Sequence, residues 1–271
     1  MQFDIESFYP SITPELLNRA IDWASDLVKI TPQQRKIIHE TKQSFLYTGS
    51  APWVKKGNVN FDIAMGAYDG AESTDLIGLF LLFQLKNLNA EIGLYRDDGL
   101  ALTGSTPRQT EKLKQQIIKI FNDNGLKITI EANLKKVEFL DVQLDLENET
   151  FKPFIKPGDK PTYVNSKSNH PPCIIKNIPA AINKRLSTIS GNTEIFNQAA
   201  PLYQNELDRN GYQYQLHFDP PNPDVKRKRR RRRRIIWFNP PWSMNVRTNI
   251  GAKFLKLVDK HFPLVTDCTP C

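Results

Sequence analysis

Apolar and polar residues alternate in short stretches that predict β-strands. One strand is predicted over residues 1–8, and Pro10 ends it. The stretch 92–102 alternates around the sequence RDDG and predicts a hairpin, with its turn near Asp98-Gly99 because Asp-Gly is favoured in tight hairpin turns. Three further stretches predict short strands: 59–63, 128–130 and 137–146.

Apolar residues recur at helical spacing after three Thr-Pro pairs, in which the threonine supplies an N-cap hydroxyl and the proline needs no N–H. Helices are therefore predicted to start at Thr13-Pro14, Thr31-Pro32 and Thr106-Pro107. The second is predicted to reach about Tyr47 before a loop over 49–57, and Gly125 closes the third. The aliphatic stretch 71–88 predicts a buried helix.

Prolines become frequent after about residue 151, which indicates a connector with short pieces of structure. Helical spacing returns over 179–210, and a short strand and an amphipathic helix are predicted at 235–238 and 250–261. We therefore expect an α+β protein in three parts. They are 1–150 with a small antiparallel sheet backed by helices, 151–225 with a connector and helices, and 226–271 with a basic run and C-terminal segment.

The net charge of +8 is concentrated in one place. Residues 226–234 read KRKRRRRRR, and removing these nine cations leaves a net charge of −1. The run has three interpretations: a nuclear-localisation signal, an electrostatic clamp on a template backbone, or an expanded low-complexity tract. As a nucleic-acid contact it would act through Lys226, Arg227, Lys228, Arg229 and Arg230, with an affinity that falls steeply as salt rises.

No stretch predicts a membrane span or a secretion signal. The apolar stretch 76–85 is about ten residues long, against the roughly 20 that a spanning helix needs. The sequence MQFDIESFYP has neither a basic nor an apolar signal-peptide region. We expect an intracellular protein without a membrane partner, and the basic run points to the nucleus. The sequence does not indicate an oligomeric state.

Three aspartates lie on or beside predicted strands, where aspartate is uncommon. A hairpin turn alone accounts for Asp98, and N-capping alone would account for Asp4, but neither accounts for Asp97. Adjacent carboxylates repel by roughly 1 to 4 kcal/mol, and a bound cation removes that repulsion. Three aspartates suit Mg²⁺, and two such ions can activate a 3′-hydroxyl and neutralise pyrophosphate.

These segments resemble a known family of polymerases. FDIESFYPSI resembles the first catalytic motif of reverse transcriptases, and YRDDG resembles their YxDD box. MGAYDGAESTDLIGLFLL is similar to the glycine-containing loop and helix between those motifs, and KKVEFLDVQLDL to the segment after them. The later stretches YVNSKSNHPP, IPAAINKRLSTIS and IIWFNPPWS resemble the C-terminal portion of Penelope-like retroelement polymerases.

The resemblance implies a polymerase palm over 1–150, followed by a thumb-like helical region. It implies RNA-directed DNA synthesis with an RNA template, a DNA primer and dNTPs, and two Mg²⁺ ions, or Mn²⁺, as cofactors. Asp4 and Asp97 would hold the metals, with Asp98 completing the cluster. The implied nucleotide-binding residues are Tyr9, Gly66 and Gly70.

Several alternatives stay open at this point. Tyr9 would exclude a 2′-hydroxyl or would be an ordinary core tyrosine, and Lys135 or Lys136 would face a triphosphate or be a solvated surface lysine. Only three residues precede Asp4, so the sequence predicts a polymerase truncated at its N-terminus, without fingers. The rival functions are a catalytically inactive nucleic-acid-binding remnant of a retroelement and an RNA-templated RNA polymerase.

Overall fold

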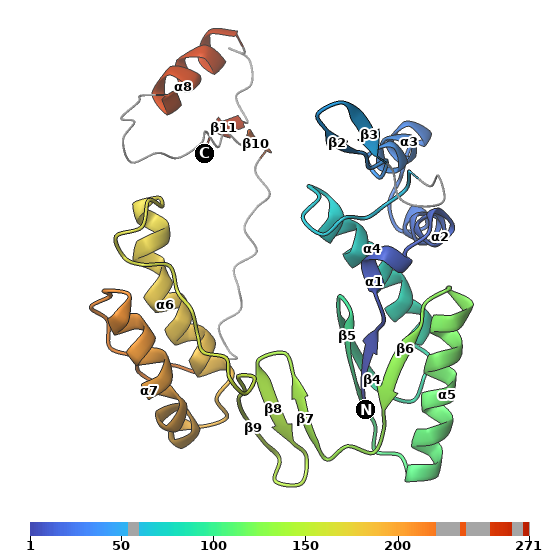
Figure 1. Ribbon diagram of the computed structural model, residues 1–271, viewed down its shortest axis with the longest axis vertical. Helices are drawn as coiled ribbons and strands as arrows, with labels where there is room; N and C mark the ends of the chain where they lie inside the picture. Colours follow the sequence, from blue (N-terminus) through green and yellow to red (C-terminus); the bar gives the residue numbers. More distant parts are fainter. Residues whose placement is uncertain (54–59, 221–233, 237–249, 262–267, 271) are drawn as a thin grey trace. The chain divides into compact units, whose positions relative to one another are not determined.

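The chain folds into two compact units of mixed α and β structure (Figure 1). The structure is a computed structural model that describes residues 1–53, 60–220, 234–236, 250–261 and 268–270. Unit 1 consists of Met1–Leu140 and Asp145–Glu147, and unit 2 of Asp141–Leu144 and Asn148–Cys271. The coarse expectation of an α+β protein is confirmed. None of the described helices is long and apolar enough to cross a bilayer.

Unit 1 is built on a four-stranded antiparallel sheet, as the alternating stretches predicted. Its strands are β1 (Gln2–Ile5), β4 (Glu91–Tyr95), β5 (Asp98–Leu102) and β6 (Ile128–Glu131), in the order β4-β5-β1-β6. Helices separate β1 from β4 and β5 from β6, which gives the β-α-β-β-α-β arrangement of a split βαβ unit. The first strand of the sequence thereby becomes a central strand of the sheet.

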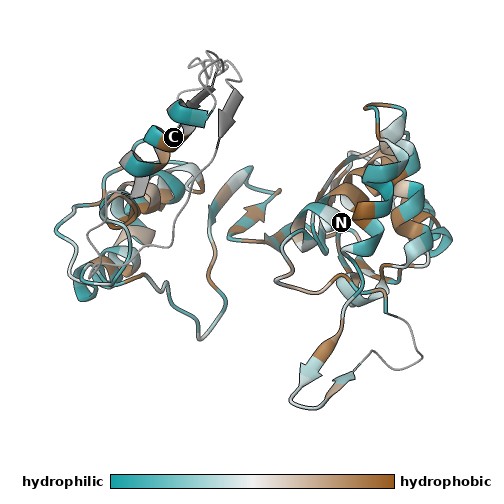
Figure 2. Ribbon diagram, turned by 90° about the horizontal axis from the view of Figure 1, so that it is seen from above, coloured by the Kyte–Doolittle hydropathy of each residue, from teal (hydrophilic) through white to brown (hydrophobic). Residues whose placement is uncertain are grey.

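Helices cover one face of this sheet. They are α2 (Pro14–Ser25), α4 (Gly70–Leu85) and α5 (Pro107–Asp123), and α1 (Phe8–Ser11) and α3 (Pro32–Glu40) complete the helices of unit 1. A single core contains Phe3 from β1 with Leu17, Ile77, Ile117 and Phe121 from the three helices. Figure 2 shows hydrophobic stretches of helix gathered around the N-terminus. Burial of these apolar side chains is the main favourable term in the stability of unit 1.

The Thr-Pro helix starts are confirmed. The Thr13 hydroxyl accepts a hydrogen bond from the Leu16 N–H at 3.2 Å, and Thr31 forms a capping box with Gln34. However, α3 ends at Glu40 and not near Tyr47. The helix ends there because the following N–H groups bond to carbonyls three residues back, as the Gln43 N–H does to the Glu40 carbonyl at 3.2 Å. The segment expected to be helix and loop forms a hairpin of β2 (Leu46–Thr48) and β3 (Ala51–Trp53).

Two strand boundaries in unit 1 differ from the prediction, the end of the first strand and the turn of the hairpin. The first strand stops at Ile5, because Ser7 adopts a left-handed backbone with a φ of 51° and α1 begins directly after it, at Phe8. The hairpin turn lies at Arg96-Asp97, since Tyr95 pairs with Asp98 and Arg96 has a φ of 56°. Asp98 is consequently the first residue of β5 and not part of the turn.

Gly99 is required for packing and not for a turn. It lies opposite Phe3, and a Cβ atom at this position would lie 2.0 Å from the Phe3 ring. Since Phe3 is buried in the core, Gly99→Ala should lower the free energy of unfolding by about 1–3 kcal/mol, as overpacking does. Gly93→Ala is the control, because a Cβ there meets nothing within 4 Å. Urea titration of both variants measures the difference, and equal midpoints would contradict the packing role.

Unit 2 centres on two helices, α6 (Pro172–Thr188) and α7 (Thr193–Arg209), joined by a short turn. Their core consists of Leu186, Phe196, Leu207, Tyr212 and Leu216. The helix predicted from residue 179 begins earlier, at Pro172, so that Pro179 lies inside α6. It is interrupted at Asn192, whose side chain accepts a hydrogen bond from Ile195 N at 2.9 Å and starts α7.

The remaining described elements are short. A three-stranded sheet contains β7 (Lys136–Phe139), β8 (Val142–Asp145) and β9 (Thr150–Pro153), and the division between the units falls within it. Nearer the C-terminus, β10 (Arg234–Ile236) pairs with β11 (Cys268–Pro270), and α8 spans Ile250–His261. The predicted strand at 235–238 thus has two residues in β10, and its other two lie outside the described residues. The expected strand at 59–63 is represented by one bridge between Gln43 and Phe61.

Candidate functional site

The face of the unit 1 sheet opposite its helices carries polar side chains. Phe3 and Ile5 are buried against the helices, so Asp4 between them points to the other face. Residues directly opposite each other in an antiparallel pair have side chains on the same face. The face opposite the helices therefore also carries the two residues that pair with Asp4, Asp98 of β5 and Thr129 of β6.

The strand register brings the three predicted aspartates to one end of the sheet. Asp4 and Asp98 are paired across β1 and β5. The Ile5 N–H donates a hydrogen bond of 3.0 Å to the Asp97 carbonyl, which fixes the hairpin turn beside the end of β1. Asp4 and Asp97, which are 93 positions apart in the sequence, therefore lie near each other in the fold.

Negative charge accumulates at this end of the sheet. Partial burial raises the pKa of Asp4 above its ordinary value of 3.8, and the charges of Asp97, Asp98 and Glu6 raise it further. The raised pKa means that ionised Asp4 is less favourable in the folded protein than in the unfolded chain. A cation bound among these carboxylates would offset that unfavourable term.

The side chains of the aspartates are not arranged around a common point. Within the described residues, no group of three or more His, Cys, Asp or Glu side chains is positioned to hold a metal ion. The fold therefore fixes the proximity of the backbones of Asp4, Asp97 and Asp98, and ligation would require their carboxylates to turn toward one ion. Asp4 and Asp97 are both exposed, which leaves room for such rotation.

Of the three predicted nucleotide-binding residues, Tyr9 lies on helix α1, Gly66 in the loop before α4, and Gly70 at the first residue of α4. Tyr9 is half-buried, packs on the core of unit 1 and makes an edge contact with Phe8 at 6.2 Å between ring centroids. Gly66 has a φ of 88°, a conformation that glycine adopts without strain. A Cβ at Gly70 would lie 2.8 Å from the Ala64 carbonyl, so contact within the chain by itself requires glycine there.

A buried ion pair at the start of α4 was missed by the sequence analysis. Lys42 is 1% exposed, and its Nζ lies 2.6 Å from Oδ2 of Asp69. The Thr41 hydroxyl donates to the same carboxylate at 2.9 Å. Desolvation would raise the pKa of Asp69, but the hydrogen bonds from Lys42 and Thr41 and the Lys42 charge lower it overall. Lys42 lies in a polar stretch, and no sequence signal distinguishes it from a surface lysine.

Two lysines proposed from the sequence to face a triphosphate have acidic partners of their own. Lys135 and Lys136 form ion pairs with Glu147 at 2.5 Å and Asp145 at 3.0 Å, which supports their interpretation as surface lysines. The predicted nucleic-acid contacts of the basic run lie outside the described residues: Lys226, Arg227, Lys228, Arg229 and Arg230.

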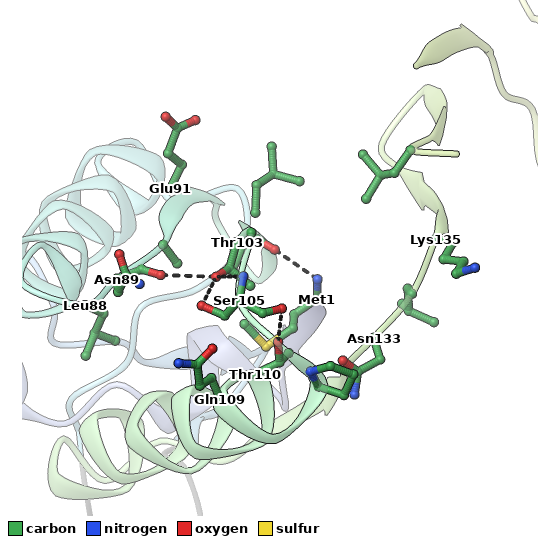
Figure 3. A pocket seen from close by; sticks show the side chains of 17 residues that line it. Met1, Leu88, Asn89, Glu91, Thr103, Ser105, Gln109, Thr110, Asn133 and Lys135 are labelled. Atoms are coloured by element: carbon green, nitrogen blue, oxygen red, sulfur yellow. Dashed lines mark hydrogen bonds between the residues drawn. The ribbon is translucent and has the colours of Figure 1, made fainter. Parts of the chain in front are cut away.

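A pocket of about 1120 Å³ lies at the end of the sheet away from the aspartates (Figure 3). It is lined by Met1, by the strand end around Leu102 and by the start of α5. Its hydroxyl groups bond within the chain, since the Thr103 hydroxyl donates to the Asn89 carbonyl at 3.2 Å and lies 2.8 Å from the Ser105 hydroxyl. These polar groups stabilise the loop before α5, and we assign the pocket no ligand.

Comparison with known proteins gives one partial match. Residues 162–222, which contain α6 and α7, match the model of an animal helix-turn-helix domain. The match covers under a quarter of the 271 residues and lies entirely in unit 2. No curated protein matches the sequence of this chain.

Proposed function

We propose that unit 1 is a polymerase palm that adds dNTPs to the 3′-hydroxyl of a DNA primer, directed by an RNA template. The observation that carries this proposal is the pairing of Asp4 with Asp98 at the strand ends, with Asp97 in the adjoining turn. An antiparallel sheet with helices on one face and carboxylates on the other leaves the acidic end open to a nucleic-acid duplex.

The chemistry of three carboxylates is of the kind that divalent cations bind, once the side chains turn toward them. Mg²⁺ prefers carboxylate oxygens, retained waters and phosphate oxygens, and Mn²⁺ has similar preferences. Bound there, the ions would supply activation of the 3′-hydroxyl and neutralisation of the departing pyrophosphate. Asp4 and Asp97 would hold them from two adjacent chain segments, and Asp98 would complete the acidic cluster. The raised pKa of Asp4 is consistent with this role, because desolvation and the charges of the neighbouring carboxylates disfavour its ionised form, and a bound cation would favour it.

Tyr9 would contribute selection of the sugar. It lies on α1, which follows β1 directly, so its ring is tied to the strand that carries Asp4. Tyr9 is packed against the core but only half-buried, and the exposed part of its side chain would contact the deoxyribose. Gly66 and Gly70 would let the backbone of the loop before α4 approach the template and the incoming nucleotide.

Metal binding at Asp4 can be tested without measuring activity. Asp4→Asn should raise the melting temperature at pH 7, because the carboxylate it removes has a raised pKa in the folded protein. A group with a raised folded pKa contributes its full stability below its unfolded value of 3.8 and loses it as the pH rises through the folded value. The difference between variant and wild type should therefore vanish as the pH falls toward 3.8.

Mg²⁺ should then reduce the difference in melting temperature between Asp4→Asn and the wild type. A ligand that binds only the folded state stabilises it, so millimolar Mg²⁺ should raise the melting temperature of the wild type and raise that of Asp4→Asn much less. Asp123→Asn, at the exposed end of α5, is the control and should respond to Mg²⁺ like the wild type. Equal Mg²⁺ responses of wild type and Asp4→Asn would count against a metal site at Asp4.

A catalytically inactive nucleic-acid-binding remnant is the second candidate. The helix-turn-helix match over 162–222 favours it, because helix-turn-helix segments commonly dock on DNA. In this case the acidic end of the sheet would have no catalytic part, and the chain would retain binding without incorporating nucleotides.

A further inference from the structure

Charge is divided unevenly between the two helices of unit 2. Residues 150–188, which include α6, contain seven Lys and Arg residues and one acidic residue, Asp159. Residues 189–220, which include α7, contain one Arg and four acidic residues. In many helix-turn-helix proteins the second helix contacts the DNA. Here the second helix belongs to the acidic half, so phosphate would be repelled from it.

The exposed side of α6 is suited to an anionic surface. Lys176 and Lys184 are both exposed, and neither takes part in an ion pair among the described residues. Ala180 and Ala181 lie between them and are also exposed. Small side chains between two cations would let the helix backbone approach a partner closely, and no acidic residue occurs anywhere on α6.

The spacing of these cations matches a duplex. Eight residues separate Lys176 from Lys184, which is about 12 Å along a helix. The major groove of B-form DNA is about 12 Å wide, whereas that of A-form RNA is too narrow for side chains to enter. Two ammonium groups at this spacing can reach phosphates on both sides of one groove. On α7, by contrast, Glu194 and Asp208 are exposed and acidic.

We propose that α6, the first helix of the pair, is the face of unit 2 that binds double-stranded DNA, with Lys176 and Lys184 on its phosphates. The inference extends the nucleic-acid binding of the proposed function to one surface and one partner, and it does not depend on catalysis in unit 1. It also separates this surface from the basic run, which would bind any nucleic acid.

Lysine acetylation of the full chain, read by mass spectrometry with and without a duplex DNA probe, tests the proposal at individual residues. Lys176 and Lys184 should be protected several-fold by the duplex, while the exposed Lys112 and Lys119 of α5 should react unchanged. Protection confined to other lysines, or equal protection by a duplex RNA of the same sequence, would overturn the proposal while leaving nucleic-acid binding by the chain intact.

Salt dependence provides a second readout with matched variants. Lys176→Gln with Lys184→Gln should reduce the slope of log affinity against log salt by about 1.8, or roughly 0.9 for each phosphate contact. Lys112→Gln with Lys119→Gln should leave the slope unchanged. Glu194→Gln with Asp208→Asn should leave the slope unchanged too. If this α7 variant instead bound more tightly, and the α6 variant bound like the wild type, the interface would be assigned to α7. All six side chains are exposed, so these variants are expected to fold.

Discussion

Replacing Asp97 with asparagine is expected to reduce primer extension at least about 100-fold. The amide has nearly the same shape but no charge, so it cannot neutralise a divalent ion held beside Asp4. Charge stabilisation by bound metal is worth several kcal/mol in the transition state, and each 1.4 kcal/mol is about tenfold in rate. The measurement is incorporation of labelled dNTP onto a DNA primer annealed to an RNA template, with Mg²⁺ present.

The control for this experiment is again Asp123→Asn, which changes the same chemical group at the exposed C-terminal end of α5. It should incorporate nucleotides like the wild type. Equal and measurable incorporation by wild type and Asp97→Asn would eliminate the catalytic role of Asp97. Absence of incorporation by both, together with salt-sensitive nucleic-acid binding, would support the inactive remnant instead.

Asp69→Asn is expected to lower the free energy of unfolding by about 3 kcal/mol, the lower end of the range for breaking a buried ion pair. The substitution leaves the Lys42 ammonium 1% exposed and without its anionic partner, and a buried charge without compensation is costly. The lower end applies because Asp69 itself is 34% exposed, so water can reach part of the site. Chemical denaturation at pH 7 measures the change.

A surface ion pair supplies the matched comparison. Asp22 lies 2.5 Å from Arg35, and both side chains are substantially exposed. Asp22→Asn should therefore cost no more than about 1 kcal/mol. Equal losses for Asp22→Asn and Asp69→Asn would show that burial of Lys42 adds nothing to the strength of its pair.

The pH dependence of the Lys42–Asp69 pair has a definite sign. The pKa of Asp69 is below its ordinary value of 3.8 in the folded protein, chiefly through Lys42 and Thr41 acting against desolvation. Its contribution to stability is thus complete above pH 3.8 and is lost as the pH falls through the folded pKa. Asp69→Asn should consequently differ most from the wild type at neutral pH, and the difference should shrink in acid.

Local sequence signals determined the elements that depend on neighbouring residues. The Thr-Pro pairs set the starts of α2, α3 and α5, because a cap is made by residues three positions apart. The alternating stretches set the strands and their buried face, since the period of two is a property of the strand itself. From these the sequence also indicated the three aspartates as the candidate site.

Contacts between distant segments decided the rest. Asp-Gly favours a turn locally, but Phe3 needs the space at Gly99, so the turn moves to Arg96-Asp97 and Asp98 pairs with Asp4. Burial of Lys42 depends on Asp69, 27 residues later, and no local pattern records such a partner. The sequence by itself thus determined which acids were candidates, and only the tertiary structure decided that they meet, because strand register is set by packing across the whole sheet.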